Sequence, residues 1–211
     1  LKFTGGSDFI ESDYEDGNSA GKWDSDPVVW FMVFKPTDIN NFHDYMLWFK
    51  QFTDDDNNIE PIAIVPGDND EFFGQVWMGD NTKGGGSYPL DQPYSTTDLS
   101  NQWNIFEIEL DPLNETVSMF LNGKTIQQGA PMSYKFPKDA EHQLRLHANW
   151  IGSEFTDGYF AEFIVIPNYQ RTKVEGYLAH KWGLSESLPT EHVYKNMAPN
   201  MNYTIKGNRT N

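Results

Sequence analysis

Carboxylates recur at every second position of one short segment, as Glu107, Glu109 and Asp111. If the segment is a strand, the three side chains share one face, because side chains alternate between the two faces of a strand. Two carboxyl groups about 5–5.5 Å apart can hydrolyse a glycosidic bond with retention, and alternate strand positions approximate that spacing. Pro112 follows at once. We interpret the row as a solvated strand face and predict no catalytic residue and no enzyme activity, with glycan cleavage as the alternative.

Asp and Asn residues also crowd into short turns, where their oxygens could bind calcium. Ca²⁺ takes roughly six to eight oxygen ligands, often from carboxylates and carbonyl groups together. The turns do not form an EF-hand loop, because Ile59 stands where that loop requires Gly. The sequence predicts calcium as the cofactor, with simple solvated turns as the alternative. The predicted ligands are Asp54, Asp56, Asp68 and Asp70.

Sites that need other residue types find no support. The chain has no Cys, which excludes disulfides, thiolate nucleophiles and Cys-ligated zinc or iron–sulfur sites. No two of the five His have the i, i+4 spacing of a helical zinc site, and we interpret them as core or surface residues. There is no Gly-x-Ser-x-Gly elbow, and the glycine run at 84–86 lacks the Lys-Ser/Thr of a phosphate-binding loop.

Sugar binding is the chemistry that the remaining residues fit best. Aromatic faces stack on pyranose rings, and Asp and Asn side chains hydrogen-bond to hydroxyl groups. The loop that contains Tyr88 is glycine-rich, and loops carry recognition on rigid β scaffolds. Burial in the core is the alternative for Trp77 and Trp150. The predicted ligand-binding residues are Trp77, Asp80, Asn81, Tyr88, Tyr94, Asn149 and Trp150.

The charge balance limits the partners. The 211 residues contain 31 Asp and Glu against 15 Lys and Arg, a net charge of −16. Nucleic acids and anionic membranes bind through Lys and Arg, so both are excluded as partners. The aromatic content of 15% excludes a disordered acidic chain. No run approaches the roughly 18 apolar residues of a membrane helix. The start at Leu1 does not resemble a signal peptide, and we expect a processed or excised chain.

Strands must position these side chains. Segments of strand length, separated by turn residues, recur about every ten residues, as in an antiparallel sandwich or barrel. The unbroken apolar run at 28–34 predicts an inner strand buried on both faces, whereas the alternation at 103–110 predicts a half-buried strand. Asn122-Gly123 predicts a tight turn. The other predicted strands are 45–49, 61–65, 72–78, 116–121, 144–150 and 158–166.

One helix is predicted, at 170–183. Its apolar residues recur at helical spacing, Glu175 falls on another face, and Gly183 can end the helix. With no internal repeat and no second core, we predict one domain over 1–194, which includes this helix, and a polar tail over 195–211.

Three stretches resemble a known family. The first is the Trp103 strand that leads to 119–124 (Met-Phe-Leu-Asn-Gly-Lys). The second is the closing strand 157–165. The third is 174–184 (VEGYLAHKWGL), followed by Leu188-Pro189 and 192–194 (HVY). Over roughly residues 3–194 the chain resembles the laminin-G-like branch of the concanavalin A-like lectin/glucanase superfamily. The resemblance implies an all-β, two-sheet antiparallel jelly-roll sandwich. The glucanase members carry Glu-x-Asp-x-Glu, whereas this chain has Glu-x-Glu-x-Asp.

The ending also resembles versions of the domain in phage, other viral and marine bacterial surface proteins. We therefore expect a non-catalytic, lectin-like module on the surface of a virion, in capsid decoration or a fibre, that attaches to glycans or to a host surface. The expected location is the virion surface or the extracellular space, and the partners are surface glycans or other virion proteins. The alternatives are a purely structural cementing protein, a bacterial adhesin domain and a glycan-cleaving enzyme. A homo-oligomer is left open.

Overall fold

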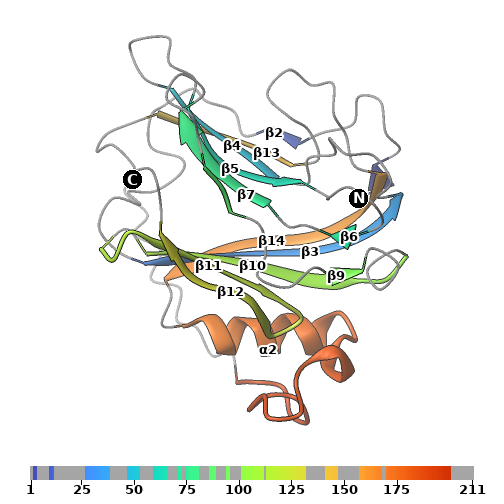
Figure 1. Cartoon of the computed structure of the whole chain (residues 1–211). Coiled ribbons are helices and arrows are strands. Elements are labelled where there is room, and N and C mark those ends of the chain that lie inside the picture. Colours follow the sequence, from blue (N-terminus) through green and yellow to red (C-terminus); the bar gives the residue numbers. More distant parts are fainter. Residues whose placement is uncertain are drawn as a thin grey trace, which may run out of the picture.

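The computed structural model describes residues 2–3, 10–11, 27–38, 47–52, 59–65, 71–72, 75–80, 86–88, 94–95, 101–111, 113–131, 141–146, 157–167 and 170–200. Within these ranges its strands form two large antiparallel sheets, and one α-helix lies on the outer side of the first sheet (Figure 1). The predicted all-β sandwich with one C-terminal helix is confirmed.

The first sheet has the order β1-β14-β3-β10-β11-β12. Its strands are β1 (Lys2–Phe3), β14 (Asp157–Pro167), β3 (Val28–Asp38), β10 (Asn104–Asp111), β11 (Thr116–Leu121) and β12 (Lys124–Pro131). Because β3 lies between β14 and β10, both of its edges are hydrogen-bonded.

The second sheet has the order β2-β13-β4-β5-β7-β8. Its strands are β2 (Ile10–Glu11), β13 (Glu141–Leu146), β4 (Leu47–Phe52), β5 (Ile59–Val65), β7 (Gln75–Asp80) and β8 (Gly86–Tyr88). A separate small pair joins β6 (Glu71–Phe72) to β9 (Tyr94–Ser95).

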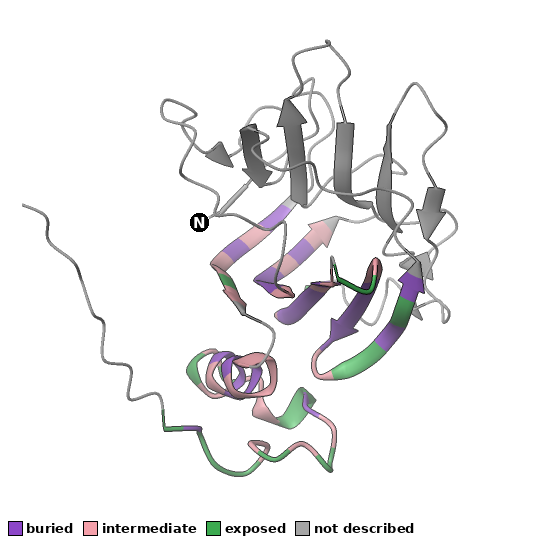
Figure 2. Cartoon of the chain, turned by 90° about the vertical axis from the view of Figure 1, so that its left-hand side faces the viewer, coloured by how far each residue is buried: buried purple, intermediate pink, exposed green. Residues whose placement is uncertain are grey.

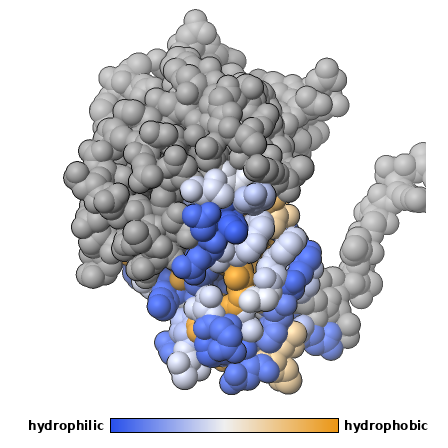
Figure 3. All heavy atoms as spheres, turned by 90° about the vertical axis from the view of Figure 1, so that its right-hand side faces the viewer, coloured by the Kyte–Doolittle hydropathy of each residue, from blue (hydrophilic) through white to orange (hydrophobic). Residues whose placement is uncertain are grey.

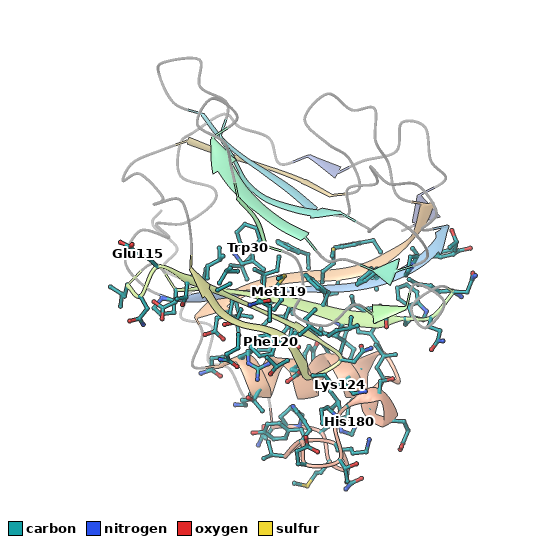
Figure 4. The ribbon with its side chains drawn as sticks, viewed as in Figure 1. Trp30, Glu115, Met119, Phe120, Lys124 and His180 are labelled. Carbon is teal, nitrogen blue, oxygen red and sulfur yellow. The ribbon has the colours of Figure 1, made fainter. Side chains whose placement is uncertain are left out.

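The apolar run of β3 is buried on both faces, as predicted. Val29 and Phe31 pack with the helix residues Val174 and Leu178 in one core cluster. Trp30, from the alternate positions, lies on the side of the second sheet (Figure 4). All residues from 29 to 34 are at most 2% exposed. Burying a large apolar side chain stabilises a fold by about 1.5–3 kcal/mol, so this strand anchors both layers.

The prediction of a half-buried strand at 103–110 is wrong. Asn104 to Ile108 are buried without interruption, so both faces of β10 are covered. One side of β10 contributes Ile105 to the cluster with the helix. The alternation of polar and apolar residues therefore reflects buried polar groups on the helix side and not a solvated face.

The helix α2 (Arg171–Lys181) closes that outer face, and it is followed by the short 3₁₀ helix η2 (Ser185–Ser187). Figure 2 shows α2 beneath the buried strands of the first sheet, with the largely exposed following segment below it. Gly183 has φ +71°, and the Leu184 amide donates to the Ala179 carbonyl at 2.6 Å. A left-handed glycine ends the helix here, as expected from the sequence.

The predicted turn at Asn122-Gly123 is confirmed. Both residues have positive φ, +49° and +78°, which suits a two-residue hairpin turn. The Asn122 side chain accepts a hydrogen bond from the Ile105 amide at 2.8 Å and donates to Asn104 Oδ1 at 3.0 Å. The turn thereby ties the β11–β12 hairpin to the start of β10.

Within the described ranges, no helix combines the length and the apolar character that crossing a membrane requires. Residues 195–200 continue the segment that follows α2. Lys195 Nζ donates to the carbonyls of Glu186 at 3.0 Å and Leu188 at 2.7 Å. The division into a domain over 1–194 and a tail over 195–211 stays a prediction.

Candidate functional site

A buried ionic network joins β10, α2 and the segment after it. Arg171 Nη1 donates to Glu107 Oε2 at 3.0 Å and lies 3.6 Å from Glu175 Oε2. His192 Nε2 lies 3.0 Å from the same Glu175 oxygen. The side chains of Glu107 and Glu175 are 0% exposed, so neither carboxyl group reaches solvent. Three elements that are distant in the sequence therefore meet at one pair of acids.

The backbone and an aromatic ring complete the surroundings. The Tyr194 amide donates to His192 Nδ1 at 3.2 Å, so the proton of the neutral ring is on Nε2 and points at Glu175. The Arg171 guanidinium lies 3.9 Å from the centre of the Phe120 ring, where a cation is attracted to the aromatic face. Arg171 is thus the one permanently positive group that these contacts bring to the two acids.

Each acid has one buried oxygen without a hydrogen-bond donor, Glu107 Oε1 and Glu175 Oε1. Burial raises the pKa of Glu107 well above the ordinary value of 4.5, and the neighbouring Glu175 raises it further, while Arg171 opposes the shift. The two carboxyl groups are also within hydrogen-bonding reach of each other. A proton held between them satisfies both oxygens and removes the repulsion of two buried negative charges.

These contacts correct the interpretation of the carboxylate row. Glu107 faces the helix and is fully buried, so the prediction of a solvated strand face is wrong for it. Asp111 belongs to a turn, where its Oδ1 accepts the amides of Leu113 and Asn114 at 3.0 Å each. Glu175 is likewise buried, although the helical pattern assigned it to another face. The row does not line a surface site.

A second polar cluster fastens the end of α2 to β14. Glu162 accepts hydrogen bonds from Trp182 Nε1 at 2.9 Å and from Lys181 Nζ at 3.0 Å. The hydrogen bond that Lys181 donates to Glu162 raises the pKa of Lys181. Trp182 stacks on Trp103, with ring centres 6.1 Å apart, and Trp103 also contacts Tyr159 at 6.3 Å. Both acceptor oxygens of Glu162 are engaged, so this cluster holds the helix in place.

Three of the predicted ligand-binding residues fall on two adjacent strands. Trp77 and Asp80 lie in β7, and Tyr88 ends β8, the last strand in the order of the second sheet. In the register, Trp77 is opposite Ser87 and Tyr88 is opposite Val76. The structure therefore brings these three positions to one edge of the sheet that the helix does not cover. Asp80 and Tyr88 fall on one face of the sheet and Trp77 on the other, because side chains alternate along a strand.

Of the other predicted site residues, the structure describes Tyr94, which does not belong to this edge. Tyr94 lies in β9, which pairs with β6 in the small separate sheet. The described residues contain no group of three acidic or histidine side chains able to hold a metal ion. The predicted calcium site stays a prediction. Outside the described residues lie the ligand-binding candidates Asn81, Asn149 and Trp150 and the metal candidates Asp54, Asp56, Asp68 and Asp70.

The described surface on one side of the molecule is mainly hydrophilic. Figure 3 shows small apolar spots separated by polar atoms over that part. A polar groove of about 650 Å³ lies between the turn at 123–125 and residues 186–191. Broad exposed apolar patches mark protein interfaces, and this part of the surface carries none.

Comparison with known proteins supports the fold. No protein-family model matches the sequence, and no curated protein sequence matches it significantly. Among solved structures, the family 7 alginate lyase A1-II′ in complex with its product aligns with a TM-score of 0.52, at 12% identity, over 77% of this chain and 72% of that chain.

Two further structures align less closely. Domain 4 of AbnA, an extracellular arabinanase from Geobacillus stearothermophilus bound to arabinotriose, gives a TM-score of 0.47 at 20% identity. The alignment covers 72% of this chain but 64% of that domain, less than two thirds of its length. The CBM40 of a Ruminococcus gnavus sialidase, bound to α2,3-sialyllactose, gives 0.46 at 13% identity, over 67% and 74% of the chains.

The alginate lyase alignment shows the fold alone. The chain is a two-sheet antiparallel jelly-roll sandwich. The identity is too low for activity or ligand to be transferred, because one fold serves many functions.

Proposed function

We propose that the chain is a non-catalytic, glycan-binding jelly-roll module whose ligand contacts lie at the β7–β8 edge of the second sheet. The observation that carries the proposal is the pairing of β7 with β8. It places Asp80 and Tyr88 on the same face of neighbouring strands, whereas Trp77 falls on the opposite face. The outer face of the first sheet is taken by α2, so the second sheet is the better candidate for a ligand (Figure 1).

The chemistry of these residue types suits a sugar. Aromatic rings give flat apolar faces for the C–H side of a pyranose, and a carboxylate accepts hydrogen bonds from its hydroxyl groups. The net charge of −16 disfavours uronate and sialic acid ligands, because the summed field of the protein repels anions. We therefore propose neutral oligosaccharides as the ligand class.

The buried acids support a role without catalysis. Of the three carboxylates with suitable spacing, Glu107 is enclosed beneath α2 and Asp111 is engaged in a turn. A glycosidase needs an acid and a base on either side of a bound glycosidic bond. Incubation with polysaccharides tests the alternative, since release of oligosaccharides from any neutral or acidic polymer shows an enzyme.

We also propose an extracellular setting, on the surface of a virion. The support is the resemblance of the ending at 174–194 to surface proteins of phages and other viruses. Mass spectrometry of purified particles tests this setting independently of ligand binding. A purely structural virion protein would be detected in the purified particles but would bind no glycan.

A glycan array tests the ligand proposal. The wild-type chain is expected to bind a set of neutral glycans, and Tyr88→Ala and Asp80→Ala are expected to lose that binding. Tyr177→Ala, on α2, is the control, because the helix lies on the other sheet (Figure 1). Thermal melts of all variants separate loss of contact from loss of fold. A wild-type chain that binds no glycan on the array contradicts the proposal.

A further inference from the structure

The segment at 184–200 is docked by the burial of Leu188 in the core cluster with α2 and by a few polar contacts. His180 Nε2 donates to the Tyr194 carbonyl at 2.7 Å, and His192 Nε2 donates to Glu175 at 3.0 Å. The Tyr194 side chain lies so close to Gly176 that a Cβ there would be 2.5 Å from Tyr194 Cβ. Glu175 is therefore both a residue of the helix and the anchor of the segment that follows it.

The charges in this anchor do not balance without an extra proton. Glu107 and Glu175 bring two carboxylates into a site without solvent, and Arg171 brings one positive charge. His192 is neutral in this arrangement, because its Nδ1 accepts the Tyr194 amide. Two ionised acids would leave one uncompensated buried charge, which is strongly destabilising. One proton shared by the two carboxyl groups restores neutrality.

The geometry also leaves a place for that proton. Glu107 Oε1 and Glu175 Oε1 are both buried and have no other donor, while both Oε2 atoms are bonded to Arg171 or His192. A buried acceptor without a donor costs about 1–3 kcal/mol. Because the two carboxyl groups lie within hydrogen-bonding reach of each other, a carboxyl hydrogen shared between them lowers this cost.

We propose that a single proton shared by Glu107 and Glu175 holds α2 and residues 184–200 on the first sheet, so that loss of this proton releases them. The device would make docking of the C-terminal segment dependent on pH, independently of any ligand at the second sheet.

Solvent lies close to the acids through the β11–β12 turn. Gly123 lines the polar groove, and a Cβ built on it would be 2.9 Å from Glu175 Oε1. Gly123, together with Leu188 and Pro189, lies between Glu175 and the groove at that point. A small opening of the turn or of Pro189, which also borders Gly123, would let water take the proton.

The direction of the pH effect follows from the pKa of Glu107. The groups that face it are Arg171 and Glu175 from α2, His192 from the following segment and the Phe120 ring beneath Arg171. Because the pKa is raised in the docked state, docking takes up a proton. The stability from this site is complete below the ordinary glutamate value and is lost as the pH rises through the raised value.

Hydrogen exchange of the full chain, followed by mass spectrometry between about pH 5 and about pH 9 and corrected for intrinsic rates, tests the proposal. In the range where docking takes up one proton, opening of residues 170–200 should increase about tenfold per pH unit. Glu107→Gln should remove this dependence, because Gln keeps the shape of the protonated acid and donates to Glu175 without a titratable proton.

The matched control is Glu191→Gln. Glu191 is exposed and adjacent to His192, and its replacement changes the net charge by the same amount. It should leave the wild-type pH dependence intact. Two results would overturn the proposal. The first is a Glu107→Gln variant whose hydrogen exchange at 170–200 keeps the pH dependence of wild type. The second is a wild-type chain in which residues 170–200 exchange at the same corrected rate as the core of β3 at every pH. If Glu107→Gln fails to fold, infrared spectroscopy of the wild-type chain decides, since a folded protein without a protonated carboxyl band at neutral pH contradicts it.

Discussion

Replacing Gly176 by Ala should destabilise the protein, although the substitution lies inside a helix. Gly is about 1 kcal/mol less favourable than Ala in a helix interior, so helix propensity alone predicts a gain. Gly176 is buried, however, and a Cβ would lie 2.5, 2.8 and 2.9 Å from three atoms of the Tyr194 side chain. The side chain of Tyr194 must move, and its backbone must move with it because the nearest atom is Cβ.

The magnitude follows from what this movement breaks. Overpacking of a closed contact costs about 1–3 kcal/mol. Displacement of Tyr194 also weakens the hydrogen bond from His180 to its carbonyl, which contributes about 1 kcal/mol. Against the propensity gain, we expect a net loss of about 1–3 kcal/mol in the free energy of unfolding. In a domain of this size, that lowers the Tm by roughly 2–4 °C per kcal/mol.

Chemical denaturation of four chains measures the effect: wild type, Gly176→Ala, Tyr194→Ala and the double variant. Once the tyrosine ring is removed, the alanine at 176 has room, so the double variant should be more stable than Tyr194→Ala. A coupling energy of about 1–3 kcal/mol is expected for residues in contact. Gly176→Ala with wild-type or higher stability, together with zero coupling, would refute the docking of the C-terminal segment on α2.

Three further predictions follow from the same contacts. Asn122→Ala should lower the free energy of unfolding by about 1–2 kcal/mol, measured by urea denaturation, because it removes the bonds to Ile105 and Asn104. At about pH 8, Glu107→Ala should destabilise by about 1–3 kcal/mol, because it removes the buried acceptor of the Arg171 hydrogen bond, whereas Glu107→Gln should match or exceed wild type in the same assay. Calorimetry should detect calcium binding, and EDTA should lower the Tm. If both signals are absent, the predicted calcium site is wrong.

The layers of the fold could be predicted from the sequence because they depend on simple patterns. An unbroken apolar run such as Val29 to Phe34 can only be satisfied by burial on both faces, and the structure places it in the centre of the first sheet. Asn122-Gly123 and Gly183 similarly require positive φ, which fixes a hairpin turn and a helix end.

The buried acids could not be predicted from local patterns. The polar side chains of an alternating strand and the charged side chains of a helix usually face solvent. Glu107 and Glu175 are buried instead, because the folded chain packs the helix against the strand and brings the two carboxyl groups together. One signal was available. Phe31 lies directly opposite Glu107 in the sheet register, and a strand buried on both faces requires covered neighbours. The partner Arg171, four residues before Glu175, is a second signal.

The candidate ligand site was predicted residue by residue, and its outcome is mixed. Asp80 and Tyr88 share one face on neighbouring strands, whereas Trp77 falls on the opposite face and Tyr94 belongs to another strand pair. Which loop positions approach one another depends on long-range pairing of strands, which composition and periodicity do not specify. Glu107 and Asp111 have a spacing that would suit catalysis, but Glu107 is buried beneath α2 and Asp111 accepts hydrogen bonds within a turn.

The central claim, a glycan contact at the β7–β8 edge, is tested most directly by isothermal titration calorimetry with a neutral oligosaccharide. The wild-type chain is expected to bind, and Tyr88→Ala is expected to weaken the affinity by at least about tenfold, since loss of one stacked aromatic ring removes on the order of 1.4 kcal/mol or more. An affinity that Tyr88→Ala and Asp80→Ala leave unchanged, in variants that melt like wild type, would contradict a glycan contact at this edge.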